Sequence, residues 1–360
     1  MAKVAVDLTP VERPKDASPW TRISPQSRTF LVLASVVPAA IYFALYLING
    51  FDFMSSLIIF FLPMQVVASA LVGIKIYGRR GILDSLLVVV TLFLGSFVFV
   101  LLISVLWSVL QAGFATLSPQ FIYQNDVYVT PTTGLEIGGV GHAILGTILV
   151  VGLSTIITVP LALATAVYLT ETRGKSRSLI RTLLQAVSGL PSVVTGLFIY
   201  SMVILSGWSQ PAGITGSLAL IPLMLPTVAR VAEESLRLVP AELRNGALGL
   251  GASAWSAFSM VTLPAAKSGL VTAVLLGVAR IIGETAPLLL TTSLANSTNL
   301  NMLDGGISTL PTYLYGYVAL GYDTSIQRAW GAALVILILV GILFAAARIA
   351  SSPKKAKKRK

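Results

Sequence analysis

The sequence predicts an all-α protein that crosses a membrane several times, and three observations support this fold class. Hydrophobic residues make up 55% of the 360 residues and charged residues only 11%, with a mean hydropathy of +0.86. Apolar runs long enough to cross a hydrocarbon core of about 30 Å recur along the chain. Lys and Arg fall on one side of the membrane when these runs are taken as spans. We therefore expect a polytopic transmembrane helical bundle.

About eight spans are expected from the apolar runs. The sixth is the weakest, because it is short and is broken by Pro222 and Pro226. It is kept because an even number of spans puts all the strongly basic segments on one side. The predicted spans cover residues 30–48, 53–76, 82–110, 143–170, 180–206, 213–229, 268–293 and 326–349.

The distribution of basic residues predicts the orientation of the chain. The loops 113–142, 207–212 and 294–325 contain no Lys or Arg, whereas the alternate loops and the run 354–360 are rich in them. Basic loops stay in the cytosol, so both termini are expected there. The net charge of +11 sits at span edges and in this tail, which is a topology pattern and not that of a nucleic-acid-binding surface.

The predicted spans fall into two blocks. Residues 1–29 are polar and proline-containing and are expected to be a disordered cytosolic tail. Residues 30–112 form an accessory block of three spans, residues 113–141 an outer loop, residues 142–350 the functional core, and residues 351–360 a basic tail. No internal repeat is evident, which counts against the inverted-repeat secondary transporters. The absence of cysteine excludes disulfides and thiolate metal sites.

A polar stretch between the sixth and seventh predicted spans, residues 230–267, has the pattern of two short helices. Pro240 suits a first helical position, and Glu242 lies in the first turn, where a carboxylate complements the helix dipole. One narrow apolar face follows at i, i+4 and i+7 spacing, made by Leu243, Ala247 and Leu250.

The second helix of the stretch is expected to run from Ala252 to Pro264. Gly249 and Gly251 end the first helix before it, and Pro264 closes the second. One of its sides carries Trp255, Phe258 and Thr262.

Two interpretations of this helix pair are open. Amphipathic helices can lie on lipid headgroups, or they can dock on another protein. The carboxylates of Glu233, Glu234 and Glu242 would face an anionic leaflet in the first case. Gly and Ala stand where a lipid-seeking helix prefers bulky residues, and small residues permit close approach by a protein. The sequence therefore favours a docking surface.

A charged pair, Arg280 and Glu284, lies within the seventh predicted span. An arginine at mid-membrane must face the protein interior or water, because exposing it to lipid costs several kcal/mol. At i, i+4 the two side chains share a helix face and can pair. The pair is either a packing device or an anion contact, since a guanidinium matches phosphate oxygens. Glu284 would then compete with the anion for Arg280.

Weaker candidates for an anion path lie in the fifth predicted span. Ser188, Ser192 and Thr195 flank Gly189 and Pro191 and can donate hydrogen bonds. Hydroxyls in membrane helices more often satisfy backbone or neighbouring helices, so this interpretation stays open. His142, the single histidine, is expected at the entrance of a span with an interfacial role.

Several segments of the chain resemble a known family. LRNGALGLGASAWSAFSMVTLP resembles the coupling-helix signature of ABC importer permeases, with Gly251, Val261, Leu263 and Pro264 at signature positions and Asn245, Gly246 and Ala247 where Glu-Ala-Ala usually stands. RVAEESLRLVPAELR, GVARIIGETAPLLLTT and AVSGLPSVVTGLFIYS resemble the phosphate-import permeases of the PstA type. The resemblance begins near His142 and does not extend to the first three predicted spans.

The resemblance implies a type I ABC importer permease core that forms half of a translocation path in a prokaryotic plasma membrane. Its partners would be a PstC-type permease, a PstB-type ATPase dimer and an external phosphate-binding protein. The substrate-path residues would be Arg280, Glu284, Thr285, Ser188, Ser192 and Thr195. The ATPase-coupling residues would be Glu242, Leu243, Ala247, Gly251, Leu263 and Pro264.

The same resemblance implies a transport subunit with no enzymatic activity or cofactor of its own. The chain has no Gly-rich run ending in Gly-Lys-Ser/Thr, so ATP would be bound by the partner ATPase. Two alternatives remain. One is an ABC permease for another oxyanion, such as sulfate, molybdate or phosphonate. The other is a gradient-driven secondary transporter, which would be expected to carry repeats and several intramembrane acids.

Overall fold

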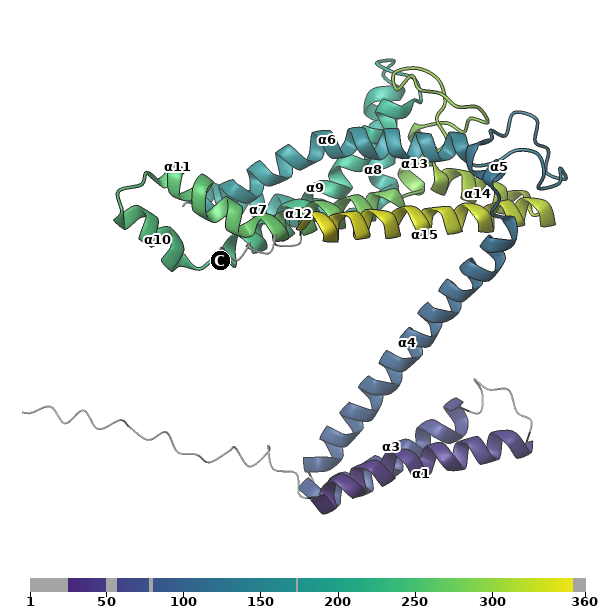
Figure 1. Cartoon of the computed structure of the whole chain (residues 1–360), viewed down its shortest axis with the longest axis vertical. Helices are drawn as coiled ribbons and strands as arrows, with labels where there is room; N and C mark the ends of the chain where they lie inside the picture. Colours follow the sequence, from purple (N-terminus) through teal and green to yellow (C-terminus); the bar gives the residue numbers. More distant parts are fainter. Residues whose placement is uncertain (1–24, 50–56, 78–79, 173, 352–360) are drawn as a thin grey trace, which may run out of the picture. The chain divides into compact units, whose positions relative to one another are not determined.

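The computed structural model describes residues 25–49, 57–77, 80–172 and 174–351, and every regular element in these ranges is a helix (Figure 1). The chain divides into two compact units, Met1–Val105 and Leu106–Lys360, and the division falls inside α4 (Arg80–Thr116). The predicted basic run 354–360 lies outside the described residues. So does most of the predicted disordered tail, residues 1–24, because α1 begins at Pro25.

The first unit is built from apolar helices that pack on one another. It holds α1 (Pro25–Asn49), a short π-helical turn η2 (Leu57–Phe61), α3 (Leu62–Tyr77) and the first part of α4. Gln65 on α3 donates a hydrogen bond to the carbonyl oxygen of Ala34 on α1 at 3.1 Å. Most large apolar side chains on these helices are exposed, as expected for helices that face lipid.

The second unit is a bundle whose central helix is α9 (Gly213–Arg237). It packs against α6 (Gly141–Glu171) on one side and α12 (Leu263–Ile282) on the other, and α15 (Asp323–Ser351) packs on α12 (Figure 1). Small residues make this packing close, because a Cβ on Gly277 of α12 would lie 2.4 Å from the Val228 side chain of α9. In the most apolar 18-residue stretch of each helix, 56% of the residues are buried in α9 and 17% in α15.

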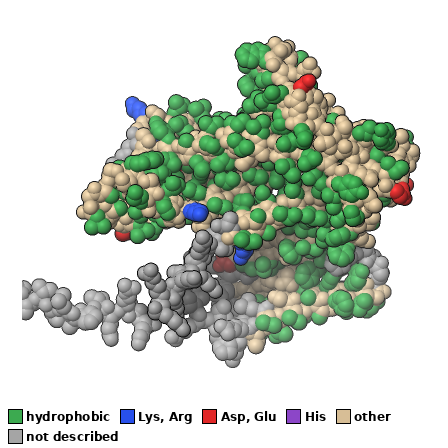
Figure 2. Space-filling view, turned by 45° about the horizontal axis from the view of Figure 1, so that its top comes forward, with side chains coloured by type: hydrophobic (Ala, Val, Ile, Leu, Met, Phe, Trp, Pro, Cys, Tyr) green, Lys and Arg blue, Asp and Glu red, His purple; other side chains and the backbone are tan. Residues whose placement is uncertain are grey.

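Among the described residues, not every predicted span corresponds to one helix that is long and apolar enough to cross a membrane. Among the described residues, five helices are long and apolar enough to cross a membrane: Leu86–Thr116, Gly141–Glu171, Gly213–Arg237, Ala254–Ile282 and Asp323–Ile349. A sixth span is added if a bent pair of helices counts as one. The first two predicted spans correspond to shorter apolar helices, Val32–Ile48 and Ile59–Lys75, so eight spans are not confirmed. Hydrophobic side chains cover most of the described face in Figure 2.

The sixth predicted span is not interrupted at its two prolines. The prediction of a broken sixth span was wrong, because α9 runs unbroken through Pro222 and Pro226. A proline leaves a carbonyl without its donor, and unpaired carbonyls are tolerated better than unpaired N–H groups, especially in a tightly packed helix.

The fifth predicted span is the one that breaks. Its parts, α7 (Lys175–Ser188) and α8 (Ser192–Ile199, continued by a π-helical turn η3, Tyr200–Ile204), meet at 98°. Gly189 caps α7 and Pro191 caps α8. The residue before a proline is disfavoured in the α conformation, so the single residue left between these caps cannot continue the helix.

The seventh predicted span also divides. Its first part belongs to α12, which ends at Ile282, and its second part is the short helix α13 (Ala286–Thr291). Gly283 caps α12. The short helix α13 packs on α8, so the pieces that follow the two breaks are neighbours (Figure 1).

The segments before α6 and α15 form a packed cap that the sequence analysis treated as loops. It holds α5 (Pro119–Tyr123) and α14 (Leu310–Leu320), the latter within the predicted loop 294–325. Buried Asp126 accepts hydrogen bonds from the Tyr317 hydroxyl at 2.5 Å and from the Gly139 N–H at 2.9 Å. Burial, with Asp126 as acceptor, raises the pKa of Tyr317, so its hydroxyl stays a donor.

A buried arginine on α15 fastens the same cap. Arg328 is 1% exposed, and its Nη2 donates to the carbonyl oxygens of Gly134 and Ile137, each at 2.7 Å. The sequence analysis did not single out this residue, because it stands at the edge of an apolar run where a basic residue is ordinary. Its carbonyl acceptors come from a segment nearly 200 positions earlier, so only the folded chain supplies them.

The contact between α8 and α13 gives a stability prediction. A Cβ on Gly196 would lie 2.6 Å from Cα of Pro287, a backbone atom that cannot move aside, whereas a Cβ on Gly152 of α6 would meet nothing within 4 Å. We expect Gly196→Ala to lower the stability of the protein by about 1–3 kcal/mol through overpacking. Gly152→Ala, the matched control, is expected to be neutral or stabilising by up to about 1 kcal/mol. Thermal unfolding in detergent measures both; equal melting temperatures would contradict this packing.

Candidate functional site

The short helices that follow two breaks, α8 and α13, pack together in the second unit. After its break, α8 packs with Gly196 against Pro287 at the start of α13. Ser192 is the first residue of α8 and is half-buried, and Thr195 is buried one turn later. Breaks inside a membrane bundle are tolerated where the freed backbone groups are buried in protein or face water. The position of these breaks is therefore the first indication of a functional site.

Arg280 lies on an exposed face of α12, level with the middle of α9. Its Nη1 donates a hydrogen bond to the Thr227 hydroxyl at 2.9 Å, and the residue is exposed on this chain. Thr227 stands ten residues before the end of α9 at Arg237, which is about 15 Å along the helix, or half of a hydrocarbon core. The apolar pattern predicts Arg280 at mid-span, and the structure adds that the residue is exposed beside α9.

The predicted ion pair between Arg280 and Glu284 is not formed. None of the ion pairs made by the described residues includes either side chain. The prediction was wrong because it assumed an unbroken helix, whereas α12 ends at Ile282 and the i, i+4 relation ends with it. Glu284 and Thr285 lie in the break before α13, both half-buried.

The remaining predicted hydroxyls fall into two places. The Thr195 hydroxyl donates to the carbonyl oxygen of Ser192 at 2.7 Å, within α8. Ser188 ends α7, on the other side of the break, and its oxygen lies 3.4 Å from Nη2 of Arg230 on α9. The structure thus brings Ser192 and Thr195 to the α8–α13 contact and Ser188 to a basic face of α9.

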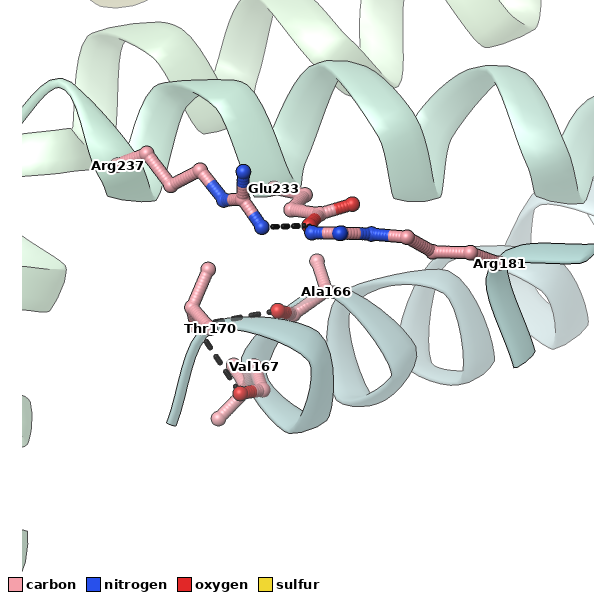
Figure 3. Close-up of polar contacts among 6 residues, drawn as sticks. All are labelled: Ala166, Val167, Thr170, Arg181, Glu233 and Arg237. Carbon is pink, nitrogen blue, oxygen red and sulfur yellow. Dashed lines mark hydrogen bonds and ion pairs between the residues drawn. The ribbon is translucent and has the colours of Figure 1, made fainter. Parts of the chain in front are cut away.

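A buried glutamate with two arginines joins α7 to α9. Arg181 and Arg237 converge on the same oxygen of Glu233, with Arg237 at 2.6 Å (Figure 3). The Glu233 residue is 8% exposed, and a buried carboxylate is costly unless it is paired in this way. The sequence analysis used Glu233 only to argue against lipid. The i, i+4 spacing of Glu233 and Arg237 was the available signal, whereas Arg181 comes from a distant segment.

The polar stretch between α9 and α12 forms an insertion, which we define as residues 241–262. It contains α10 (Ala241–Gly249), α11 (Ala254–Ala257) and a π-helical turn η4 (Phe258–Thr262). As predicted, Glu242 lies in the first turn of α10 and the helix ends at Gly249. Gly251 has φ +88°, a left-handed conformation that favours glycine.

The second helix of the insertion differs from the prediction. It begins at Ala254, after a Ser253 cap, and not at Ala252. Pro264 does not close it, because α11, η4 and α12 form one continuous helix from Ala254 to Ile282. The π-helical turn just before the proline pairs the Leu263 N–H with the carbonyl oxygen of Phe258, five residues back. This wider turn accommodates Pro264, so the helix continues.

Several large apolar side chains of the insertion are exposed, whereas Ala257 and Phe258 are buried. The most exposed are Leu250 at 92%, Met260 at 76% and Trp255 at 72%. Leu243 is also exposed and Ala247 is half-buried, and Leu263, the first residue of α12 just beyond the insertion, is exposed. Exposed large apolar side chains that gather in one segment indicate a candidate site of association.

An ion pair that the sequence analysis missed holds α10 to the bundle. The Arg244 guanidinium binds both carboxylate oxygens of Glu171, the last residue of α6, with Nη1 to Oε1 at 3.0 Å. Bidentate pairs of this kind are geometrically specific. The two residues are 73 positions apart, so no local pattern could have paired them.

Comparison with known proteins finds that this chain is similar to membrane components of transport systems. Residues 158–352 match the family of binding-protein-dependent transport system inner membrane components. "Phosphate transport system permease protein PstA 1" of Mycobacterium tuberculosis is 37% identical over 273 residues, which are 75% of this chain and 87% of that protein. "Phosphate transport system permease protein PstA" of Mycobacterium leprae is 40% identical over 58% of this chain and 70% of its own length.

A third relative and one solved structure are also similar to this chain. The PstA protein of Haemophilus influenzae is 36% identical over 66% of this chain and 82% of its own length. A chain of the MetNI methionine ABC transporter in an inward-facing form aligns at a TM-score of 0.48 and 21% identity, over 59% of this chain and 95% of its own length. The assignment rests on the sequence matches alone. By those matches, this chain belongs to the binding-protein-dependent transport system inner membrane components and, among them, to the PstA-type permeases.

Proposed function

We propose that this chain is a membrane-spanning permease subunit of an ATP-driven importer of inorganic phosphate and forms half of its translocation path. The observation that carries the proposal is Arg280. It is exposed at the middle of a membrane bundle, in a chain 37% identical to a phosphate permease subunit over most of that protein's length. The exposed guanidinium provides a positive charge that an anion could contact, and the similarity to phosphate permeases indicates that the anion is phosphate.

The exposure of Arg280 indicates which face of α12 and α9 would line the translocation path. A cation at mid-membrane cannot face lipid, so this face of α12 and α9 is covered by a second membrane subunit or by water. The guanidinium is held by a neutral hydroxyl, that of Thr227, and not by a carboxylate. Its charge is therefore available to an oxyanion, whose oxygens its planar donors match. We propose a PstC-type permease as the second subunit, with the path between the two chains.

The insertion is the proposed docking surface for the motor. Its uncovered Leu243, Leu250 and Trp255 would fit a groove on a PstB-type ATPase dimer, which binds the ATP. Phosphate would be delivered at the opposite end of the bundle by an external binding protein. This arrangement puts the insertion and both termini in the cytosol of a prokaryotic cell, as the basic loops predict.

Two rigid connections would transmit movement of the insertion to the path. The continuous helix from Ala254 to Ile282 joins the insertion directly to Arg280. The ion pair of Arg244 with Glu171 joins α10 to the end of α6. A displacement of the insertion by the ATPase would therefore move α12 and α6 against α9, and Arg280 with them.

Replacing Arg280 tests the anion path. We expect Arg280→Gln to abolish phosphate uptake while the complex still assembles, because the side chain is exposed and pairs with no carboxylate in the described residues. The double variant Arg280→Gln, Glu284→Gln is expected to remain inactive. Lys267→Gln, at the other end of α12, is the control and should keep uptake. Restored uptake in the double variant would show that Arg280 serves only packing.

Docking of the insertion is tested at Gly246, which lies in α10 with open space around it. We expect Gly246→Trp to leave the fold of this chain intact but to uncouple ATP hydrolysis from uptake, because the indole would block close approach of the ATPase. Gly246→Ala is the control and should preserve coupling, with a gain in helix stability of about 1 kcal/mol. Co-purification of the ATPase and uptake per ATP hydrolysed are measured. Wild-type values for the Trp variant would exclude docking at this face.

The role of the ion pair is tested by charge exchange. We expect Arg244→Glu or Glu171→Arg alone to lower coupled uptake, because two like charges would then face each other where a bidentate pair stood. The double variant, with both charges exchanged, should recover a substantial part of the lost uptake. ATPase activity measured alongside distinguishes uncoupling from loss of assembly. No recovery in the double variant would mean that α10 is not held through this pair.

A further inference from the structure

We infer that Arg230 is a second anion contact, placed between Arg280 and the insertion end of the bundle, where a transported oxyanion leaves the path. The inference rests on the proposed function and extends it to Arg230, to which neither the sequence motifs nor the relatives assign a role. Four residues of α9, named here the exit face, carry the argument: Thr227, Arg230, Glu234 and Arg237.

The exit face is continuous along the helix. Its four residues follow one another at intervals of 3, 4 and 3 positions, which places them within a sector of about 80° on an α-helix. Arg230, Glu234 and Arg237 are exposed, and Thr227 is half-buried where it holds Arg280. Arg230 stands about 4.5 Å along the axis from Thr227, and Arg237 about 15 Å. The face therefore leads from mid-membrane to the end of the helix.

A cavity opens beside this face. It has a volume of about 170 Å³, several times the ~30 Å³ share of one water molecule, so a tetrahedral oxyanion fits. Three arginines and two glutamates line it, a formal net charge of +1, together with two neutral residues; the full lining is Arg181, Leu184, Gln185, Arg230, Glu233, Glu234 and Arg237. The cavity thus attracts anions weakly, as suits a site of release.

Arg230 is the cation in this cavity whose charge is not already matched. Arg181 and Arg237 both bind the carboxylate of Glu233. Within the described parts of the chain, no ion pair includes Arg230, whose recorded partner is the Ser188 hydroxyl at 3.4 Å. The Ser188 hydroxyl itself donates to the carbonyl oxygen of Gln185 at 2.9 Å, so the Arg230 guanidinium supplies the donors that an oxyanion would accept.

Ser188 connects this contact to the broken span. It ends α7 immediately before the 98° bend, while Ser192 begins α8 on the other side. An anion that leaves Arg280 along α9 meets Arg230 and Ser188 next, and Glu234, exposed one turn further, limits how tightly it is held. The same donors would suit the phosphate of an anionic lipid. The transported ion is favoured because the contact lies on the same face of α9 as Thr227, whose hydroxyl accepts a hydrogen bond from Arg280.

The test compares Arg230→Gln, Arg230→Lys and Ser188→Ala with the control Lys175→Gln, an exposed cation at the far end of α7. The complete complex, purified with its native partners, is reconstituted in vesicles, and labelled phosphate uptake is followed against the concentration of loaded binding protein. We expect the maximal rate of Arg230→Gln to fall about tenfold or more, the effect of losing one charge-assisted hydrogen bond. The half-saturating concentration should not change, because the binding protein acts at the other end of the bundle.

The other variants are expected to lower the maximal uptake rate by smaller amounts or not at all. Arg230→Lys keeps the charge without the planar fork and should lose less, as should Ser188→Ala, while Lys175→Gln should match the wild type. If Arg230→Gln does not assemble, an unchanged maximal rate in both Arg230→Lys and Ser188→Ala overturns the inference. A rise in the half-saturating concentration with an unchanged maximal rate also overturns it.

Three further outcomes separate the inference from its alternatives. Absence of phosphate uptake by the assembled wild-type complex would refute the proposed function itself. Normal uptake by both wild type and Arg230→Gln would refute only the role of Arg230. The assay is repeated in vesicles of phosphatidylcholine alone and in vesicles with added phosphatidylglycerol. A defect confined to the anionic vesicles would identify a lipid contact and overturn the inference, whereas an equal defect in both supports it.

Discussion

The requirement that polar groups find partners where water is scarce governs this structure more than any single contact. Backbone groups in a membrane bundle are satisfied within helices, so a helix break needs protection by protein or by a water-filled path. The chain has two such breaks in its second unit, at Gly189–Pro191 and at Gly283–Thr285, and the short helices that follow them, α8 and α13, pack on each other. The proline-containing α9 stays whole because packing on both sides supports it. The breaks therefore mark the region where the chain departs from a plain bundle.

The need for partners also separates the charged residues into two groups, buried and exposed. Asp126, Arg328 and Glu233 are buried, and each makes hydrogen bonds or ion pairs that fix distant segments to one another, Arg328 through its Nη2. Arg280 and Arg230 are exposed, and each contacts only a neutral hydroxyl in the described residues. A matched, buried charge holds the fold together, whereas an exposed charge at membrane depth must have something outside this chain to face. This contrast, more than the mere presence of an arginine in a span, distinguishes the proposed path from packing.

The mechanical side of the proposal follows from helix continuity. The π-helical turn η4 lets one helix run past Pro264. The second half of the insertion and Arg280 therefore belong to one continuous helix, from Ala254 to Ile282. The ion pair of Arg244 with Glu171 adds a second link between the insertion and the bundle. Both links enter the bundle through helices that pack on α9. A motor that moves the insertion would thus act on the two neighbours of the central helix.

The sequence by itself determined the helical membrane class, the approximate positions of the apolar segments, the place of the insertion and the presence of an arginine, Arg280, within an apolar segment. These follow from hydropathy, from local capping residues and from the cost of a charge in an apolar run, all of which are properties of short segments. Tertiary structure decided which spans break, because Pro222 and Pro226 are tolerated in a packed helix whereas Gly189 and Pro191 cap two helices. It also decided the partners of Arg181, Arg244, Arg280 and Arg328, each supplied by a segment more than 50 positions away. Pairings across such separations depend on how helices pack, and no local pattern of residues encodes that.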